Sequence, residues 1–284
     1  MEITAKDVKK LRDKTGAGMM DCKKALTEAG GDFAGAERIL KEMGLAAAQK
    51  RAGRATDEGR VFTRVSGKQA GILELSCETD FVARNKDFMA LGGSMLTRML
   101  DEGLDEKSEA VQSMLQEAIG TIKENMGVSR FARMTADDDE LIVDYVHGDG
   151  GGIGVLAKIK TGSPDLLDDE KVKAFAFDIA LHVAAFNPPY LSVDTVPEQY
   201  KEEQRAIYKK QAESMGKPEK VVDGIVQGKM KKHLAEIALE EQPFVKDDKR
   251  SVKQVAEDIG KEIGTTVQVA DFIYFRVGDE SGSE

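Results

Sequence analysis

The sequence contains few of the residues that usually mark a reaction centre or a cross-linked fold. Its two cysteines, Cys22 and Cys77, are too few for a disulfide framework, and this low number fits a reducing compartment. We expect both to be buried small apolar side chains rather than nucleophiles. The three histidines, His147, His182 and His233, fall in different predicted elements and match no metal-ligand spacing. Neither a catalytic residue nor a metal ion or cofactor is therefore expected.

Long apolar runs are also missing. No stretch approaches the roughly 18 apolar residues that a membrane span needs, and the first residues lack the apolar core of a signal peptide. We therefore expect a cytoplasmic protein without a membrane partner. The net charge of −10 makes it a poor general binder of nucleic acid, and it is compatible with a protein partner that has a basic or mixed surface.

The 284 residues suffice for two or three small domains, and the N-terminal part predicts a bundle of short helices. Thr4 can cap the first helix, a second spans 19–29, and Asp32 can cap a third that ends at Gly44. A bundle of this size resembles a ubiquitin-associated domain. We assign residues 1–54 to it, including a linker that follows the third helix and whose first residues can also be helical.

The next part predicts a compact α+β unit. Alternating apolar residues indicate a β-hairpin over 61–78, with one buried face. Helices are expected over 81–100 and 108–126, and a short strand over 131–134 closes the unit. We assign residues 55–140 to this first half of a core.

The same order of elements then returns. A hairpin over 141–160 and a helix over 168–186 are followed, after an interruption, by a helix over 252–263 and a strand over 267–277. The predicted fold is therefore multidomain α+β, and we interpret its core as a duplication of two ββααβ halves. The second half is assigned to residues 141–186 plus 241–277.

An insertion, 187–240, interrupts the second half. Pro188 ends one helix and Pro197 opens the next, and a turn at 216–218 joins two helices whose apolar residues recur every three or four positions. This predicts an antiparallel coiled-coil hairpin. Such an arm serves dimerisation or docking in some proteins, whereas pairing of its own helices also explains the stripe, so both interpretations stay open. The polar tail, 278–284, is expected to be disordered.

The glycine-rich segment 147–154 raises the question of a phosphate-binding loop. Such a loop needs backbone N–H groups at a helix N-terminus, usually with a lysine after the glycines. Here the glycines precede an apolar strand and no Gly-Lys-Ser/Thr occurs. The pattern favours a hairpin loop, so the chain is not expected to bind a nucleotide by itself.

Two adjacent methionines begin the predicted second helix. Met19 and Met20 lie about 100° apart around the helix axis, so both cannot face one small core. One should be exposed beside the small residues 16–18, where a flexible thioether is an adaptable contact for a partner, flanked by Arg12 and Lys23. A partly buried methionine with a solvated rim explains the pattern equally well.

The segment Thr79, Asp80, Phe81 and Val82 lies where a buried strand is followed by a helix. In one interpretation Thr79 or Asp80 caps the helix and Phe81 packs into the core. In the other, the aromatic ring beside a carboxylate is a wedge that enters a partner. Spacing alone favours the first interpretation.

Four segments, in chain order, are similar to signatures of the elongation factor Ts family. They are LR at 11–12 with TGAGMMDCKKAL at 15–26, CETDFVARN at 77–85, HVAA at 182–185 with NP at 187–188 and YL at 190–191, and QPFV at 242–245. Ordered matches over nearly the whole chain, two of them nine or more residues long, are highly specific.

The resemblance implies guanine nucleotide exchange on the GTPase elongation factor Tu during translation elongation, by a protein without catalytic residues of its own. It implies that the N-terminal domain, with Arg12, Met19, Met20 and Lys23, holds the GTPase domain, and that residues 79–82 displace the magnesium ion so that GDP leaves and GTP binds.

The resemblance also implies that the second core half contacts another domain of the partner, with His147 among the contacts. The alternative function is a protein-binding scaffold that uses the N-terminal bundle without nucleotide exchange. A homodimer through the hairpin or the core stays open, and no direct contact with nucleic acid is expected.

Overall fold

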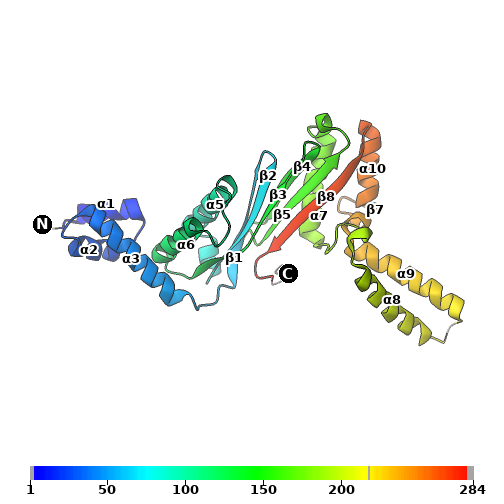
Figure 1. The fold of residues 1–284 in the computed structure, drawn as a ribbon, viewed down its shortest axis with the longest axis horizontal. Helices are drawn as coiled ribbons and strands as arrows, with labels where there is room; N and C mark the ends of the chain where they lie inside the picture. Colours follow the sequence, from blue (N-terminus) through cyan, green and yellow to red (C-terminus); the bar gives the residue numbers. More distant parts are fainter. Residues whose placement is uncertain (1–2, 217, 280–284) are drawn as a thin grey trace.

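The computed structural model describes residues 3–216 and 218–279 and shows a mixed α+β protein, which confirms the predicted class. Figure 1 shows an elongated molecule with the N-terminal helices at one end, the sheets of the core in the middle and a helical hairpin at the other end. Within these described ranges, no helix is both long and apolar enough to cross a membrane.

Three helices form the N-terminal bundle: α1 Ala5–Thr15, α2 Met19–Glu28 and α3 Phe33–Arg51. The Thr4 hydroxyl accepts the N–H of Asp7, and the Asp7 carboxylate accepts the N–H of Thr4, so the cap predicted at Thr4 is confirmed and is part of a capping box. Asp32 caps α3 as predicted. Their small core contains Leu11, Cys22 and Leu26.

The expected end of α3 at Gly44 is wrong, because the helix continues for two further turns. The segment 45–50 after Gly44 is rich in alanine and other good helix formers, so propensity favours continuation. Gly44 itself is buried against a helix of the core. Its lack of a side chain therefore serves a close helix crossing rather than a helix end.

The first sheet has the order β1-β2-β3 and is antiparallel. Its strands are β1 Glu58–Ser66, β2 Gln69–Cys77 and β3 Met126–Thr135, and its helices are α4 Asp80–Ala83, α5 Lys86–Asp101 and α6 Glu109–Ile122. Leu73, Leu75 and Cys77 of β2 pack beneath α5 and α6 in one core with Phe88. The predicted hairpin is confirmed.

Two predicted helices of this half need correction. The helix expected over 81–100 is broken into α4 and α5, because the Asn85 side chain accepts the N–H of Asp87 and starts a new helix. The helix expected over 108–126 ends at Ile122, because Lys123 adopts a left-handed conformation with φ 72°. Met126 therefore begins β3 rather than ending a helix.

The second sheet has the order β4-β5-β8 and repeats the arrangement of the first. Its elements are β4 Glu140–His147, β5 Ile153–Thr161, α7 Glu170–Phe186, α10 Val252–Ile263 and β8 Val267–Arg276. Short elements that the sequence did not indicate are η1 Pro164–Leu166, η2 Val193–Thr195, η3 Leu239–Glu241, β6 Pro243–Phe244 and β7 Asp247–Ser251. The matching order is consistent with a duplicated core.

The two sheets pack face to face, which the sequence did not indicate. Their shared core includes Val61 and Ile72 from the first sheet and Leu156 and Phe275 from the second. A Cβ on Gly154 would lie 2.4 Å from a methyl group of Val61, so only glycine fits there. The two halves therefore form one packed body around this interface.

Two antiparallel helices, α8 Glu198–Glu213 and α9 Glu219–Ile237, form the protruding hairpin seen in Figure 1. They pack on one another through a narrow stripe that contains Ala212, Val222, Val226 and Met230. Of the predicted turn, Lys217 lies outside the described residues. Residues 280–284, most of the tail predicted to be disordered, lie outside them as well.

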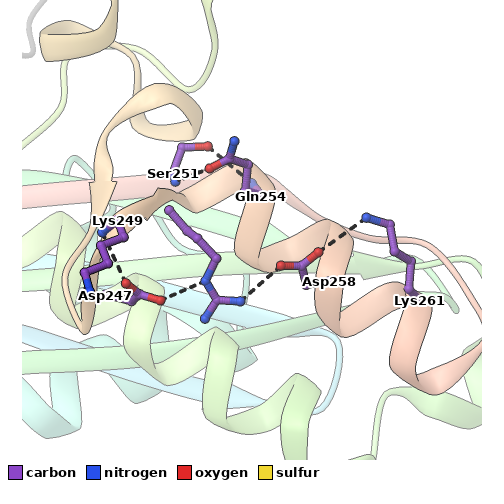
Figure 2. Close-up of polar contacts among 7 residues, drawn as sticks. Asp247, Lys249, Ser251, Gln254, Asp258 and Lys261 are labelled. Atoms are coloured by element: carbon purple, nitrogen blue, oxygen red, sulfur yellow. Dashed lines mark hydrogen bonds and ion pairs between the residues drawn. The ribbon is translucent and has the colours of Figure 1, made fainter.

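Figure 2 shows how α10 begins. Ser251 and Gln254 form a capping box at its N-terminus. Asp247 accepts a hydrogen bond from Nε of Arg250 at 2.8 Å, and Asp258 accepts one from Nη1 of the same guanidinium at 3.0 Å. These contacts join β7 to the first turns of α10, although exposed ion pairs of this kind add little to stability.

Candidate functional site

The short helix α4 presents an aromatic ring to solvent. Thr79 caps the helix, with its hydroxyl accepting the N–H of Val82 at 3.4 Å. Val82 and Ala83 face the core of the first half, whereas Phe81 is 83% exposed. The interpretation in which Phe81 packs into the core is therefore wrong, and the cap predicted at Thr79 is confirmed.

A carboxylate lies beside this ring. Asp80 pairs with Arg84 at 3.7 Å across one turn, and both side chains are about half exposed or more. Because an exposed pair of this kind is weak, a partner can compete for the carboxylate. The segment thus presents an apolar ring and an acidic group from one helical turn, whose start is fixed by the cap at Thr79.

The base of α4 is fixed by a residue that the sequence analysis missed. The Glu124 carboxylate accepts the N–H of Thr79 at 3.0 Å and its hydroxyl proton at 2.7 Å. The neighbouring Glu78 accepts the N–H of Asn125 and pairs with Arg54, and these donors lower the pKa of the Glu78 carboxyl. No local pattern links Glu124 to Thr79, because the two residues are far apart in sequence.

Neither cysteine has the properties of a nucleophile. Cys22 and Cys77 are both fully buried. Burial raises the pKa of the Cys77 thiol to about 12 and also raises the pKa of Cys22. Because the thiolate is the reactive form, the prediction that both are apolar packing residues is confirmed.

The two methionines of α2 are both on the surface. Met19 is 43% exposed and Met20 is 75% exposed, where one exposed methionine was predicted. The flanking Arg12 and Lys23 are exposed too. Met20 is the more exposed of the two, so it is the stronger candidate for a contact.

His147 lies exposed at the end of β4, on a different half of the molecule from Met20 and Phe81. Its Nδ1 is 2.9 Å from the Tyr145 hydroxyl, and Tyr145 contacts the 46% exposed Phe177 edge to face. Phe177 was missed because its helix α7 is apolar on most positions. The predicted contact residues thus form three separate surfaces rather than one pocket.

The glycine-rich segment is a hairpin loop, as predicted. It joins β4 to β5, with Gly148 and Gly151 in left-handed conformations. The carbonyl of Asp149 accepts a hydrogen bond from Arg60 at 2.8 Å. The loop therefore leads into a strand and makes contact with the first sheet.

The third and fourth signature segments meet in space. The His182 ring is fully buried, with Nε2 2.8 Å from the Gln242 side-chain oxygen, and its Nδ1 accepts the N–H of Val245 at 3.2 Å. Burial lowers the pKa of His182. These residues lie on either side of the helical hairpin, so the bonds close its base.

A hollow of about 820 Å³ lies between α10 and β8 and is lined in part by Glu240, Lys253 and Lys261. Burial raises the pKa of Glu240. The hollow contains none of the predicted contact residues. The three surfaces instead have exposed apolar side chains beside charged groups. Such surfaces are typical of a protein that acts by contact with another macromolecule.

Comparison with known proteins agrees with this class. The elongation factor TS family model matches residues 78–279. Elongation factor Ts of Borrelia recurrentis (strain A1) is 49% identical over 98% of this chain and all of its own length. The protein of the same name from Treponema denticola is 43% identical over 98% of this chain and 99% of its own.

The chain belongs to the elongation factor Ts family. Its role is therefore that of a nucleotide exchange factor in translation elongation rather than of a catalyst of a chemical reaction.

Proposed function

We propose that the chain releases GDP from the GTPase elongation factor Tu by inserting Asp80 and Phe81 next to the nucleotide, where they displace the magnesium ion. The observation that carries this proposal is the 83% exposure of Phe81 on a helix whose cap is held by Glu124. An exposed, well-oriented ring is costly to keep in water, and a partner pocket would bury it.

The energies involved are compatible with this mechanism. A nucleotide held with nanomolar affinity is bound by about 12 kcal/mol, and a thousandfold faster release needs about 4 kcal/mol. Burial of the Phe81 ring supplies roughly 1.5–3 kcal/mol, and loss of the magnesium charge from the phosphates supplies energy on a similar scale. Coupling is reciprocal, so GTP binding in turn weakens the factor's hold.

Docking is assigned to the other two surfaces. Arg12, Met19, Met20 and Lys23 on the ubiquitin-associated-like bundle would hold the GTPase domain, and His147 would contact another domain of the partner. The 75% exposure of Met20 and the surface position of His147 support this assignment. The hairpin is proposed to be a coiled-coil arm, and the cytoplasm to be the place of action.

Release of a fluorescent GDP from the matching elongation factor Tu tests the proposal. Wild type should accelerate release, and Phe81→Ala should reduce the maximal rate by about tenfold or more, the equivalent of about 1.4 kcal/mol or more. Phe186→Ala is a matched control, because Phe186 is 55% exposed at the end of α7. No acceleration by wild type would contradict the function, and equal loss in both variants would contradict the wedge.

A further inference from the structure

Two consecutive residues after α6 contact two different functional surfaces. The Lys123 ammonium lies 2.9 Å from the Asp21 carboxylate of α2. The next residue, Glu124, accepts both hydrogen bonds from Thr79 at the base of α4. A segment of two residues thus connects the helix of Met20 with the helix of Phe81.

The connection to α2 is supported by the way the N-terminal bundle is attached to the core. Helix α3 crosses α6 so closely that a Cβ on Gly120 would lie 2.8 Å from the Cα of Gly44. Lys41 and Glu117 form a second ion pair across the same crossing, at 3.4 Å. The bundle therefore rests on α6 directly rather than being held only by the linker 52–57.

The connection to α4 matters because that helix has only four residues. A helix this short has little stability of its own, since nucleation is unfavourable. Its direction depends on the cap, and Glu124 accepts hydrogen bonds from both the backbone N–H and the hydroxyl of the capping residue Thr79. Phe81 follows the cap by two positions, so the orientation of its ring follows the position of Glu124.

Lys123 makes this geometry possible by a backbone conformation that lysine rarely adopts. Its φ of 72° ends α6 and turns the chain. The side chain of Lys123 then reaches α2, and that of Glu124 reaches α4. Glycine would adopt this conformation more readily. A glycine could not, however, form the bridge to Asp21.

We propose that Lys123 and Glu124 are positioning residues that couple the docking helix α2 to the wedge helix α4, so that both engage the GTPase as one preorganised unit. The inference rests on the proposed function of Phe81 and Met20. Preorganisation raises the rate because the two surfaces then need not be ordered separately during binding. The Lys123–Asp21 pair is 46% and 31% exposed, so its loss should change exchange by about two- to fivefold.

The absence of tryptophan from the sequence allows the orientation of α4 to be measured directly. Phe81→Trp introduces a single tryptophan, whose time-resolved anisotropy in the free factor reports local motion of the side chain. This reporter is combined with Glu124→Ala, Glu124→Gln, Asp21→Lys, Lys123→Asp and the double charge reversal. GDP release is measured in the same set with Phe81 restored.

Glu124→Ala should increase the motion at position 81 and lower the maximal release rate about tenfold, with a smaller change in the half-saturating concentration. Glu124→Gln keeps one acceptor oxygen, so its motion at position 81 and its release rate should lie between those of Glu124→Ala and wild type. Each single charge reversal should lower the rate about two- to fivefold, and the double reversal should restore both anisotropy and rate. Reversal of Lys171 and Glu262, an exposed ion pair in the second core half, singly or together, is the matched control and should leave both readouts near wild type.

Lys123→Gly separates the positioning role from a structural one. Because glycine suits the left-handed conformation, the melting temperature should be unchanged or higher, while the release rate still falls. Normal rate and anisotropy in the Glu124 and charge-reversal variants, or no recovery in the double reversal, would overturn the coupling. If the coupling is overturned while wild type still accelerates GDP release, the proposed exchange function stands. If wild type does not accelerate GDP release, the exchange function itself is contradicted.

Discussion

The carboxylate of Glu124 accepts two hydrogen bonds from Thr79, one from its backbone N–H at 3.0 Å and one from its hydroxyl at 2.7 Å. The Thr79 oxygen also accepts the N–H of Val82. The hydroxyl is therefore donor and acceptor at once, and it joins the end of α6 to the start of α4. Loss of this one group should affect both stability and exchange.

Thr79→Val retains the shape of the side chain but removes the hydroxyl. Loss of the cap and of one bond to a charged group should lower the free energy of unfolding by about 1–2 kcal/mol. Urea unfolding measures this change, and the GDP release assay should show a lower maximal rate. Thr79→Ser restores the hydroxyl and should recover most of both. If Thr79→Ser loses as much as Thr79→Val, retention of the hydroxyl does not preserve the cap, and the prediction fails.

Met20→Ala should weaken complex formation without changing the stability of the free chain, because the side chain is 75% exposed. Loss of a central apolar contact raises a dissociation constant about tenfold, and calorimetric titration with nucleotide-free elongation factor Tu measures it. Met215→Ala is the control, because Met215 is 54% exposed in the turn between α8 and α9, and Figure 1 shows this hairpin at the opposite end of the molecule from α2. If Met215→Ala weakens binding as much, the hairpin also contacts the partner.

Gly120→Ala should separate α3 from α6, because its Cβ would lie 2.8 Å from the Cα of Gly44. Overpacking of this kind costs about 1–3 kcal/mol. Gly93 lies in α5 with nothing within 4 Å of a Cβ, so Gly93→Ala should instead stabilise by up to about 1 kcal/mol. Thermal unfolding of both variants tests the crossing, and a stabilised Gly120→Ala would contradict it.

His182 should make the stability of the protein depend on pH. Burial lowers its pKa in the folded chain below the ordinary value of about 6.5, so the unfolded chain binds the proton more readily. The contribution of the neutral ring is fully present above about pH 6.5, and it is lost as pH falls toward the folded pKa.

His182→Gln removes this dependence, so its free energy of unfolding should fall less than that of wild type between about pH 7.5 and 5.5. Phe177→Ala, which changes the same helix but removes no titrating group, should keep the wild-type dependence. Parallel curves for wild type and His182→Gln would contradict the role of the buried ring.

Much of the secondary structure could be predicted because its signals are local. The cap at Thr4 and the alternating residues of β2 involve neighbours within three positions, and both appear as expected. Two of the errors lie at Gly44 and Asn85, where a local signal has two meanings. Gly44 is a packing residue instead of a helix end, and Asn85 starts a helix inside a run that is otherwise continuous.

The sequence by itself determined the family, through ordered segments, and it also determined which residues could be contacts. The exposure of Phe81, the packing of one sheet on the other and the link from Asp21 through Lys123 and Glu124 to Thr79 were decided only by the tertiary structure. Asp21 and Lys123 are far apart in the chain, and no periodicity relates them. Such contacts arise when helices pack, so they follow from the shape of the folded core rather than from any local pattern.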